Sequence, residues 1–148
     1  MPILNEGATA PNFSLFTDQG AKVTLSSSLQ DKPLVLFFYP KDDTPGCTIE
    51  CKEFRDARAE FEQKAHVFGI SPDDVQSHQA FRDKYALNFP LLADPGHEVA
   101  SQFGVWGPKK NGSEGIHRTT FVIRDGKIAR VFVDVKPEGH AAQVLATL

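Results

Sequence analysis

The stretch that decides the fold reads Leu34-Val35-Leu36-Phe37-Phe38-Tyr39, followed by Pro40-Lys41-Asp42-Asp43-Thr44-Pro45-Gly46-Cys47. The continuous apolar run has the length of a strand that is covered on both faces. The strand ends at Pro40, a short polar loop follows, and a helix is expected to begin near Thr48. Cys47 then lies where the unpaired N–H groups of a helix start converge and where the helix dipole favours negative charge. We therefore expect the Cys47 thiol to ionise at neutral pH.

The elements around this stretch alternate between strands and helices. The segments on either side of Thr17-Asp18-Gln19-Gly20 predict an N-terminal β-hairpin. Further strands are expected at residues 66–70, 91–92, 119–123 and 127–133, the last two joined by a turn at Asp125-Gly126, and helices at 48–63, 71–85, 97–103 and 137–148. In the second of these helices Ser71 is the expected N-cap and Pro72 the first helical residue. The pattern predicts an α/β fold with a central mixed sheet flanked by helices. The order of these strands and helices along the chain fits a thioredoxin-like arrangement, and it also fits other three-layer folds.

Length and composition predict one domain over residues 1–148, because 148 residues with 41% hydrophobic content can bury a full core. The formal net charge of -3 argues against a general attraction to nucleic acid or to an anionic membrane. No apolar run approaches the roughly 18 residues of a membrane span. The first residues, Met-Pro-Ile-Leu-Asn-Glu-Gly, lack the regions of a signal peptide, so we expect a cytoplasmic protein. Two cysteines leave redox chemistry or simple burial as their possible roles.

Residues 38–48 contain the pattern Pro-x-x-x-Thr-x-x-Cys and resemble the active-site segment of peroxiredoxins, most of all the peroxiredoxin Q or bacterioferritin comigratory protein branch. The match continues in order at residues 54–56, 69–71, 103–106, 117–121 and 135–140. The resemblance implies a thioredoxin fold and reduction of hydrogen peroxide and organic hydroperoxides through a cysteine thiolate and a sulfenic acid. It also implies recycling by thioredoxin and no metal or prosthetic group. We expect a monomer or a weak homodimer.

By this resemblance Cys47 is the peroxidatic cysteine, Thr44 and Pro40 belong to the peroxide pocket, and Arg118 is the active-site arginine. Taken alone, Thr44 equally fits a loop residue that bonds its own backbone, and Arg118 fits a solvated charge at a strand end. As a site residue, Arg118 brings a permanent charge and a rigid fork of donors, which suits a thiolate and a leaving oxygen. Pro40 fixes the backbone and removes a donor, so it can shape a pocket of limited water access.

Two other residues have two interpretations each, and the histidines argue against one kind of site. Glu50, one turn after Cys47, can orient Arg118 through a charge-assisted bond, and a solvated helix face explains it nearly as well. Trp106 fits core packing better than a place at the site. The histidines have no metal-ligand spacing with one another or with the cysteine pair, which argues against a zinc site.

The second cysteine leaves the recycling step open. Many members of the family place a resolving cysteine five residues after the peroxidatic one, where this chain has Lys52; Cys51 is four residues on. In an ideal helix, Cα atoms four residues apart are about 6 Å apart, within the roughly 7 Å limit for a disulfide. The Cβ atoms are about 5–6 Å apart and a disulfide needs about 3.8 Å, so a bond would distort the first turn. Cys51 is therefore either the resolving residue or a core residue on a stripe formed by Cys47, Cys51, Phe54, Arg58 and Phe61.

Two other functions compete with a thiol peroxidase. A disulfide oxidoreductase of thioredoxin type would have Cys-x-x-Cys, and this chain has Cys-x-x-x-Cys. A non-catalytic redox sensor would respond to oxidation of Cys47 without needing a peroxide pocket. The combination of Thr44 and Arg118 therefore favours catalysis over sensing.

Overall fold

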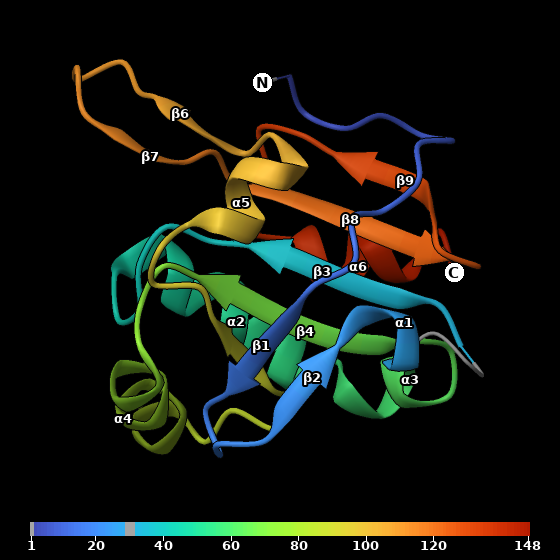
Figure 1. Ribbon diagram of the computed structural model, residues 1–148. Helices are drawn as coiled ribbons and strands as arrows, with labels where there is room; N and C mark the ends of the chain where they lie inside the picture. The colour runs from blue at the N-terminus through green and yellow to red at the C-terminus, as the bar shows by residue number, and fades with distance from the viewer. Residues whose placement is uncertain (1, 29–31) are drawn as a thin grey trace.

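The computed structural model describes residues 2–28 and 32–148, and its centre is a seven-stranded sheet in the order β2-β1-β5-β4-β3-β8-β9 (Figure 1). The strands are β1 Ser14–Thr17, β2 Lys22–Thr24, β3 Leu34–Phe38, β4 His66–Ser71, β5 Leu91–Ala93, β8 Thr119–Arg124 and β9 Lys127–Phe132. β3, β4 and β5 run parallel, and the other neighbouring strands pair antiparallel. The predicted mixed sheet and both predicted hairpins are thereby confirmed.

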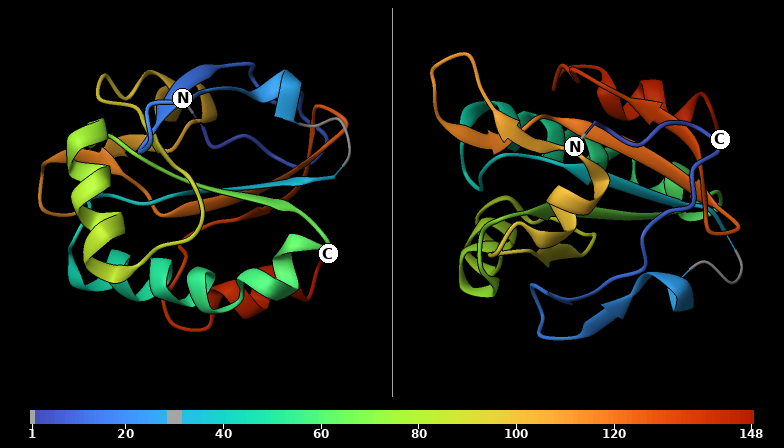
Figure 2. Two further views of the ribbon diagram at one scale, coloured as in Figure 1. Left: turned by 90° about the horizontal axis from the view of Figure 1, so that it is seen from below. Right: turned by 45° about the horizontal axis from the view of Figure 1, so that its top comes forward.

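Helices lie on both sides of this sheet. They are α1 Leu25–Ser28, α2 Pro45–Asp56, α3 Arg58–Glu62, α4 Val75–Tyr85, α5 Glu98–Phe103 and α6 His140–Leu145. Figure 2 shows α2, α3 and α6 in a row beneath the sheet and α5 on the opposite side. None of the helices in the described part of the chain is long and apolar enough to cross a membrane.

The central strand β3 explains why the core has two halves. Leu34, Leu36 and Phe38 pack into one cluster, with α5 and β8. Val35, Phe37 and Tyr39 point the other way and pack with α2, α4 and α6. Since side chains of a strand alternate between the two faces, a strand covered on both sides must be apolar throughout. The loop that follows β3 therefore starts from the middle of the molecule.

The helix predicted at residues 48–63 differs from the structure at its start and in its middle. It begins at Pro45, because proline needs no N–H bond at the first helical position and its φ suits a helix. It is interrupted at Ala57 (φ -91°, ψ 6°), after which α3 begins. The predicted stripe is buried except at Arg58, which is exposed, whereas Phe61 on the same short helix α3 is buried. Cys47 therefore lies inside the first turn rather than before it.

Two further predictions need correction. The helix expected from Ser71 begins at Val75, because Ser71 still pairs with Ala93 as the end of β4. Its N-cap is Asp74, whose carboxylate accepts the N–H of Ser77 at 2.8 Å. The short antiparallel pair β6 Trp106–Pro108 and β7 Glu114–Ile116 is absent from the predicted elements, because three-residue strands with glycine and proline show no clear alternation.

Candidate active site

Cys47 is the third residue of α2, and its side chain is 1% exposed. Thr44 is the N-cap, with extended backbone (φ -102°, ψ 156°), and its carbonyl accepts the N–H of Thr48 at 2.8 Å. The first turn therefore starts immediately after the loop that leaves β3. This geometry sets the Cys47 sulfur among the first N–H groups of a twelve-residue helix, where negative charge is favoured.

Arg118 reaches this sulfur from the neighbouring strand β8. It directly precedes that strand, and the pairing of Phe38 with Thr119 brings it to the end of β3. Its Nη2 donates to the Sγ atom of Cys47 at 3.3 Å, and its Nη1 donates to the Oε1 atom of Glu50 at 2.7 Å. The predicted pairing of a thiol with an arginine fork is therefore present in the folded chain.

The close approach of Arg118 depends on a glycine. A Cβ atom at Gly46 would lie 3.2 Å from Nη2 of Arg118 and 3.3 Å from Cγ of Pro137. Both contacts are tighter than ordinary van der Waals packing. A side chain at this position would push the guanidinium away from the sulfur.

Glu50 is fully buried, so the interpretation as a solvated face is wrong and the orienting contact with Arg118 is confirmed. Burial raises the pKa of Glu50 to about 7, although the charge and hydrogen bond of Arg118 act in the opposite direction. The Oε2 atom of Glu50 has no hydrogen-bond partner among the described residues. Near neutral pH the carboxyl group of Glu50 is therefore present in both its neutral and its charged form.

Thr44 and Pro40 lie at the same end of the sheet. The Thr44 hydroxyl donates to the carbonyl of Lys41 at 2.8 Å, which is the local contact expected of a loop residue. Pro40 and Arg118 line a surface cavity of about 550 Å³, together with the apolar side chains of Ile116 and Val135. This cavity gives the arginine side of the site an opening to solvent.

Cys51 is entirely buried in the cluster beneath α2, and both cysteines are free thiols. Burial and the neighbouring charges of Glu50 and Cys47 raise the pKa of the Cys51 thiol well above its ordinary value. In the folded helix Cys51 is thus a neutral packing residue, next to Phe54 in the cluster.

Trp106 belongs to the packing of the opposite face. Its ring stacks on His97, with 3.8 Å between ring centroids and 3° between the planes, and it packs against the cluster that contains Phe103. The packing interpretation of Trp106 is confirmed.

Sequence reasoning missed a group of residues below the loop, namely Asp42, Asp43 and His78. Asp42 bonds to Tyr39 and to α4, and Asp43 bonds to Lys84 at 2.8 Å. One signal was available for His78: it stands three residues before Phe81 on the buried face of an amphipathic helix. A polar residue on such a face needs a buried partner.

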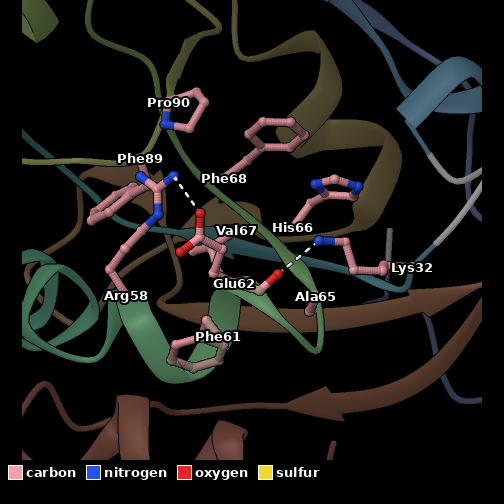
Figure 3. Close-up of a pocket in the computed structure, with 10 residues that line it drawn as sticks. All are labelled: Lys32, Arg58, Phe61, Glu62, Ala65, His66, Val67, Phe68, Phe89 and Pro90. Carbon is pink, nitrogen blue, oxygen red and sulfur yellow. Dashed lines mark hydrogen bonds and ion pairs between the residues drawn. The ribbon is translucent and has the colours of Figure 1, made fainter.

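A second cavity, of about 340 Å³, lies at the opposite end of the parallel strands (Figure 3). Aromatic residues and the cations Lys32 and Arg58 line it. Glu62 contacts both cations, its carbonyl accepting from Lys32 at 2.7 Å and its carboxylate lying 3.9 Å from Arg58. Pro40, Thr44, Cys47, Glu50 and Arg118 do not line this cavity, so it is separate from the cysteine site.

Comparison with known proteins identifies the class. Residues 7–131 match the model of the AhpC/TSA family. Peroxiredoxin Bcp from Bacillus subtilis is 44% identical over 147 residues, with 96% of this chain and 93% of the relative covered. A PrxQ mutant from Xylella fastidiosa matches with a TM-score of 0.94 at 36% identity, over 99% of this chain and 96% of its own. The bacterioferritin comigratory protein from Xanthomonas campestris matches with a TM-score of 0.88 at 34% identity, over 98% of this chain and 94% of its own.

A buried thiol at a helix start of a thioredoxin-like fold, together with these relatives, defines a thiol-dependent peroxidase of the peroxiredoxin class. The chain belongs to the AhpC/TSA family. Members of this family act on peroxides and use thioredoxin-like thiol reductants.

Proposed function

We propose that Cys47 is the residue at which this peroxidase attacks its substrate, and that Pro40, Thr44 and Arg118 form the peroxide pocket. The observation that carries the proposal is the contact of 3.3 Å between Nη2 of Arg118 and Sγ of Cys47 in the first turn of α2. A guanidinium beside a sulfur at a helix start stabilises the thiolate, which is the nucleophilic form of cysteine. Residues 1–148 act as one peroxiredoxin domain in this proposal.

The chemical step is a displacement at oxygen. The thiolate of Cys47 attacks one peroxide oxygen, an S–O bond forms and the O–O bond breaks. Cysteine is oxidised to the sulfenic acid, and the peroxide is reduced to an alkoxide or hydroxide that takes a proton from water. Arg118 faces the reacting sulfur with fixed donors, so it can stabilise the charge on the departing oxygen without reorganisation.

Thr44 has a specific part in this step. Its own hydroxyl hydrogen is directed to the carbonyl of Lys41, which leaves the Oγ1 lone pairs able to accept a hydrogen bond. A peroxide O–H can therefore donate to Thr44 while Arg118 donates to the other oxygen. The loop contact and the substrate contact of Thr44 are compatible.

The substrates in this proposal are hydrogen peroxide and alkyl hydroperoxides. The structure of the Xanthomonas campestris relative was described together with its alkyl peroxide reduction activity. The cavity beside Arg118 includes the apolar side chains of Ile116 and Val135, which suit an alkyl chain. Thioredoxin is the proposed reductant, Cys51 the proposed resolving residue, and a monomer or weak homodimer the proposed form.

A steady-state assay tests the function as a whole. The protein is mixed with thioredoxin, thioredoxin reductase, NADPH and either hydrogen peroxide or an alkyl hydroperoxide. Continuous NADPH consumption that depends on both peroxide and protein is the expected result. A single turnover followed by a halt would instead support a redox sensor, and reduction of insulin disulfides would support a disulfide oxidoreductase.

A further inference from the structure

A buried polar cluster connects the catalytic loop to α4. The carboxylate of Asp42 accepts from the hydroxyl of Tyr39 at 2.6 Å and from the hydroxyl of Ser77 at 2.7 Å. Its Oδ2 atom also lies 2.7 Å from Nδ1 of His78. The side chains of His78 and Asp42 are 0% and 4% exposed. The loop after β3 and the helix α4, 35 to 36 residues apart in sequence, thus meet at one carboxylate.

The hydrogen-bond partners decide the protonation state of His78. Its Nε2 atom lies 2.9 Å from the carbonyl oxygen of Leu92, which can only accept, so Nε2 carries a hydrogen. Two hydroxyl groups donate to Asp42, one to each carboxylate oxygen, which favours the form of that group that only accepts, the ionised carboxylate. With Asp42 ionised, Nδ1 donates as well, which makes His78 an imidazolium.

The charges around His78 agree with this assignment. Burial lowers the pKa of His78, but the hydrogen bond and the charge of Asp42 outweigh it, and the pKa is raised. The other titratable groups of the cluster are Tyr39, from the end of β3, and Asp73, just before α4. Asp73 adds a second negative charge, and the pKa of Tyr39 is raised far enough by burial that it stays neutral.

The same contacts hold the backbone of the loop. The N–H of Asp42 donates to the carboxylate of Asp73 at 2.8 Å. Asp43, at a positive φ of 56°, accepts from Lys84 and from Tyr85 at 2.8 Å each. Such a backbone conformation persists only where the surroundings hold it. The loop is therefore anchored to both ends of α4, and the next residue along the chain is Thr44.

We infer that His78 is a positioning residue for peroxide reduction, which as a buried cation on α4 holds Asp42 and so fixes Thr44 and the first turn of α2 beside Arg118. The inference rests on the proposed role of Cys47. Asp42, Asp73 and His78 also have ligand atoms within 4.8 Å of one another. However, the 2.7 Å hydrogen bond between His78 and Asp42 leaves no room for a cation between those atoms.

Nuclear magnetic resonance on the wild-type protein tests the protonation state without any assay of activity. The imidazole ¹⁵N signals of His78 are assigned by comparison with His78→Gln and followed from pH 5 to pH 10. Both nitrogens should be protonated at pH 7, with titration above the usual range of histidine near 6.5. A neutral ring at pH 7 with Nδ1 unprotonated would overturn the inference, whatever the role of Cys47.

Kinetics test the effect on catalysis. We expect His78→Gln to lower kcat/KM for peroxide about 10- to 100-fold, because small misplacements of reacting groups have effects of this size. The matched control is His97→Gln, which changes a histidine stacked on Trp106 on the other face of the sheet and should stay within twofold. Wild-type activity should also fall at alkaline pH as His78 titrates, and this decline should be absent from His78→Gln.

The outcomes separate this inference from the proposed function. Full activity of Cys47→Ser would refute the proposed function and leave the NMR result standing. Rates of His78→Gln within twofold of wild type, or an alkaline decline that persists in this variant, would refute the positioning role alone. If His78→Gln does not fold, the ¹⁵N signals of His78 are assigned instead by their change in the more conservative Asp42→Asn variant. The NMR titration of the wild-type protein then still decides the protonation state.

Discussion

At the level of single residues, the site depends on how one guanidinium is shared. Arg118 uses one nitrogen for the Cys47 sulfur and another for the Glu50 carboxylate, at 3.3 Å and 2.7 Å. The short contact with Glu50 holds the planar group in orientation, so that its other edge faces the sulfur. Charge alone would not reproduce this arrangement, because the two contacts need a fork of fixed geometry.

Replacing Cys47 by serine should abolish peroxide turnover and leave folding intact. The hydroxyl fits the space of the thiol, but it is a far weaker nucleophile at neutral pH. NADPH-coupled turnover measures the loss, and circular dichroism checks the fold. Retention of more than a few per cent of wild-type activity would rule out Cys47 as the attacking residue. Cys51→Ser is the matched control for the first oxidation step, measured by stopped-flow mixing with peroxide, because it changes the other thiol and should leave that step intact.

Replacing Arg118 by lysine should not restore the activity lost in Arg118→Ala. Lysine keeps the charge and lacks the fork, and loss of one such donor typically lowers a rate about 10²- to 10³-fold. Stopped-flow oxidation of Cys47 by peroxide measures the step directly. Arg130→Lys on β9 is the control, because Arg130 is exposed and the carboxylate oxygen of Glu6 that it faces is 3.9 Å away. Wild-type rates in Arg118→Ala would show that Arg118 is only a surface charge.

Among the secondary-structure elements, α2 serves two states in the proposed cycle. Its first turn holds Cys47 beside Arg118, while Cys51 is fully buried one turn later. In an intact helix the two Cβ atoms are too far apart for a disulfide without distortion. The Thr44 side chain makes no capping bond to the helix, so the first turn is held mainly by the loop and by Arg118. Such a turn can open locally without unfolding the domain.

Oxidation by one equivalent of peroxide should therefore give a disulfide between Cys47 and Cys51. The sulfenic acid of Cys47 condenses with the thiol of Cys51 and releases water, after the first turn opens. Mass spectrometry should show an intramolecular loss of two hydrogens and no probe-reactive sulfenic acid. A gain of one oxygen, trapped by a sulfenic-acid probe while Cys51 remains free, would instead mean one-cysteine behaviour with an external thiol. Cys51→Ser should trap that same oxygen adduct and calibrates the measurement.

Across the molecule as a whole, Glu50 and His78 are two of the buried ionisable groups that link stability to pH. The pKa of Glu50 is raised to about 7 by burial, and the pKa of His78 is raised by Asp42 against the effect of burial. A group whose pKa is higher in the folded state binds its proton more tightly there. The contribution of such a group to the free energy of unfolding is complete below its pKa in the unfolded state. It is lost as the pH rises through its pKa in the folded state. Both groups therefore favour the folded state at mildly acidic pH.

The contribution that Glu50 and His78 make to the free energy of unfolding should thus fall as the pH rises from about 5 to 9. Glu50 acts from its unfolded pKa of about 4.5 up to about 7, and His78 acts from about 6.5 upward. Each group changes the stability by at most about 1.4 kcal/mol per pH unit. Urea unfolding at a series of pH values measures the slope. In a plot of the free energy of unfolding against pH, Glu50→Gln should flatten the slope at acidic pH, and His78→Gln should flatten it at alkaline pH. Unchanged slopes in both variants would contradict this assignment.

Features that depend on neighbours along the chain follow from the amino-acid sequence alone. The apolar run Leu34–Phe38 had to be a strand covered on both faces, and Asp125-Gly126 had to be a tight turn between β8 and β9. Pro40, Thr44 and Cys47 stand within eight residues, so the peroxiredoxin resemblance and the position of the thiol near a helix start can be recognised from that segment. Local geometry and local motifs need no knowledge of distant contacts.

Which charges are buried, and what they meet, depends instead on the tertiary fold. Glu50 resembles any acid on a helix surface until the register of β3 with β8 brings Arg118 to it, 68 residues away. Asp42 resembles a solvated loop residue until α4 places His78 against it, 36 residues away. Burying a charge is unfavourable unless a partner is supplied, and in both cases the partner comes from another element. Charge pattern along a chain cannot reveal such pairs, because strand register and helix docking create them.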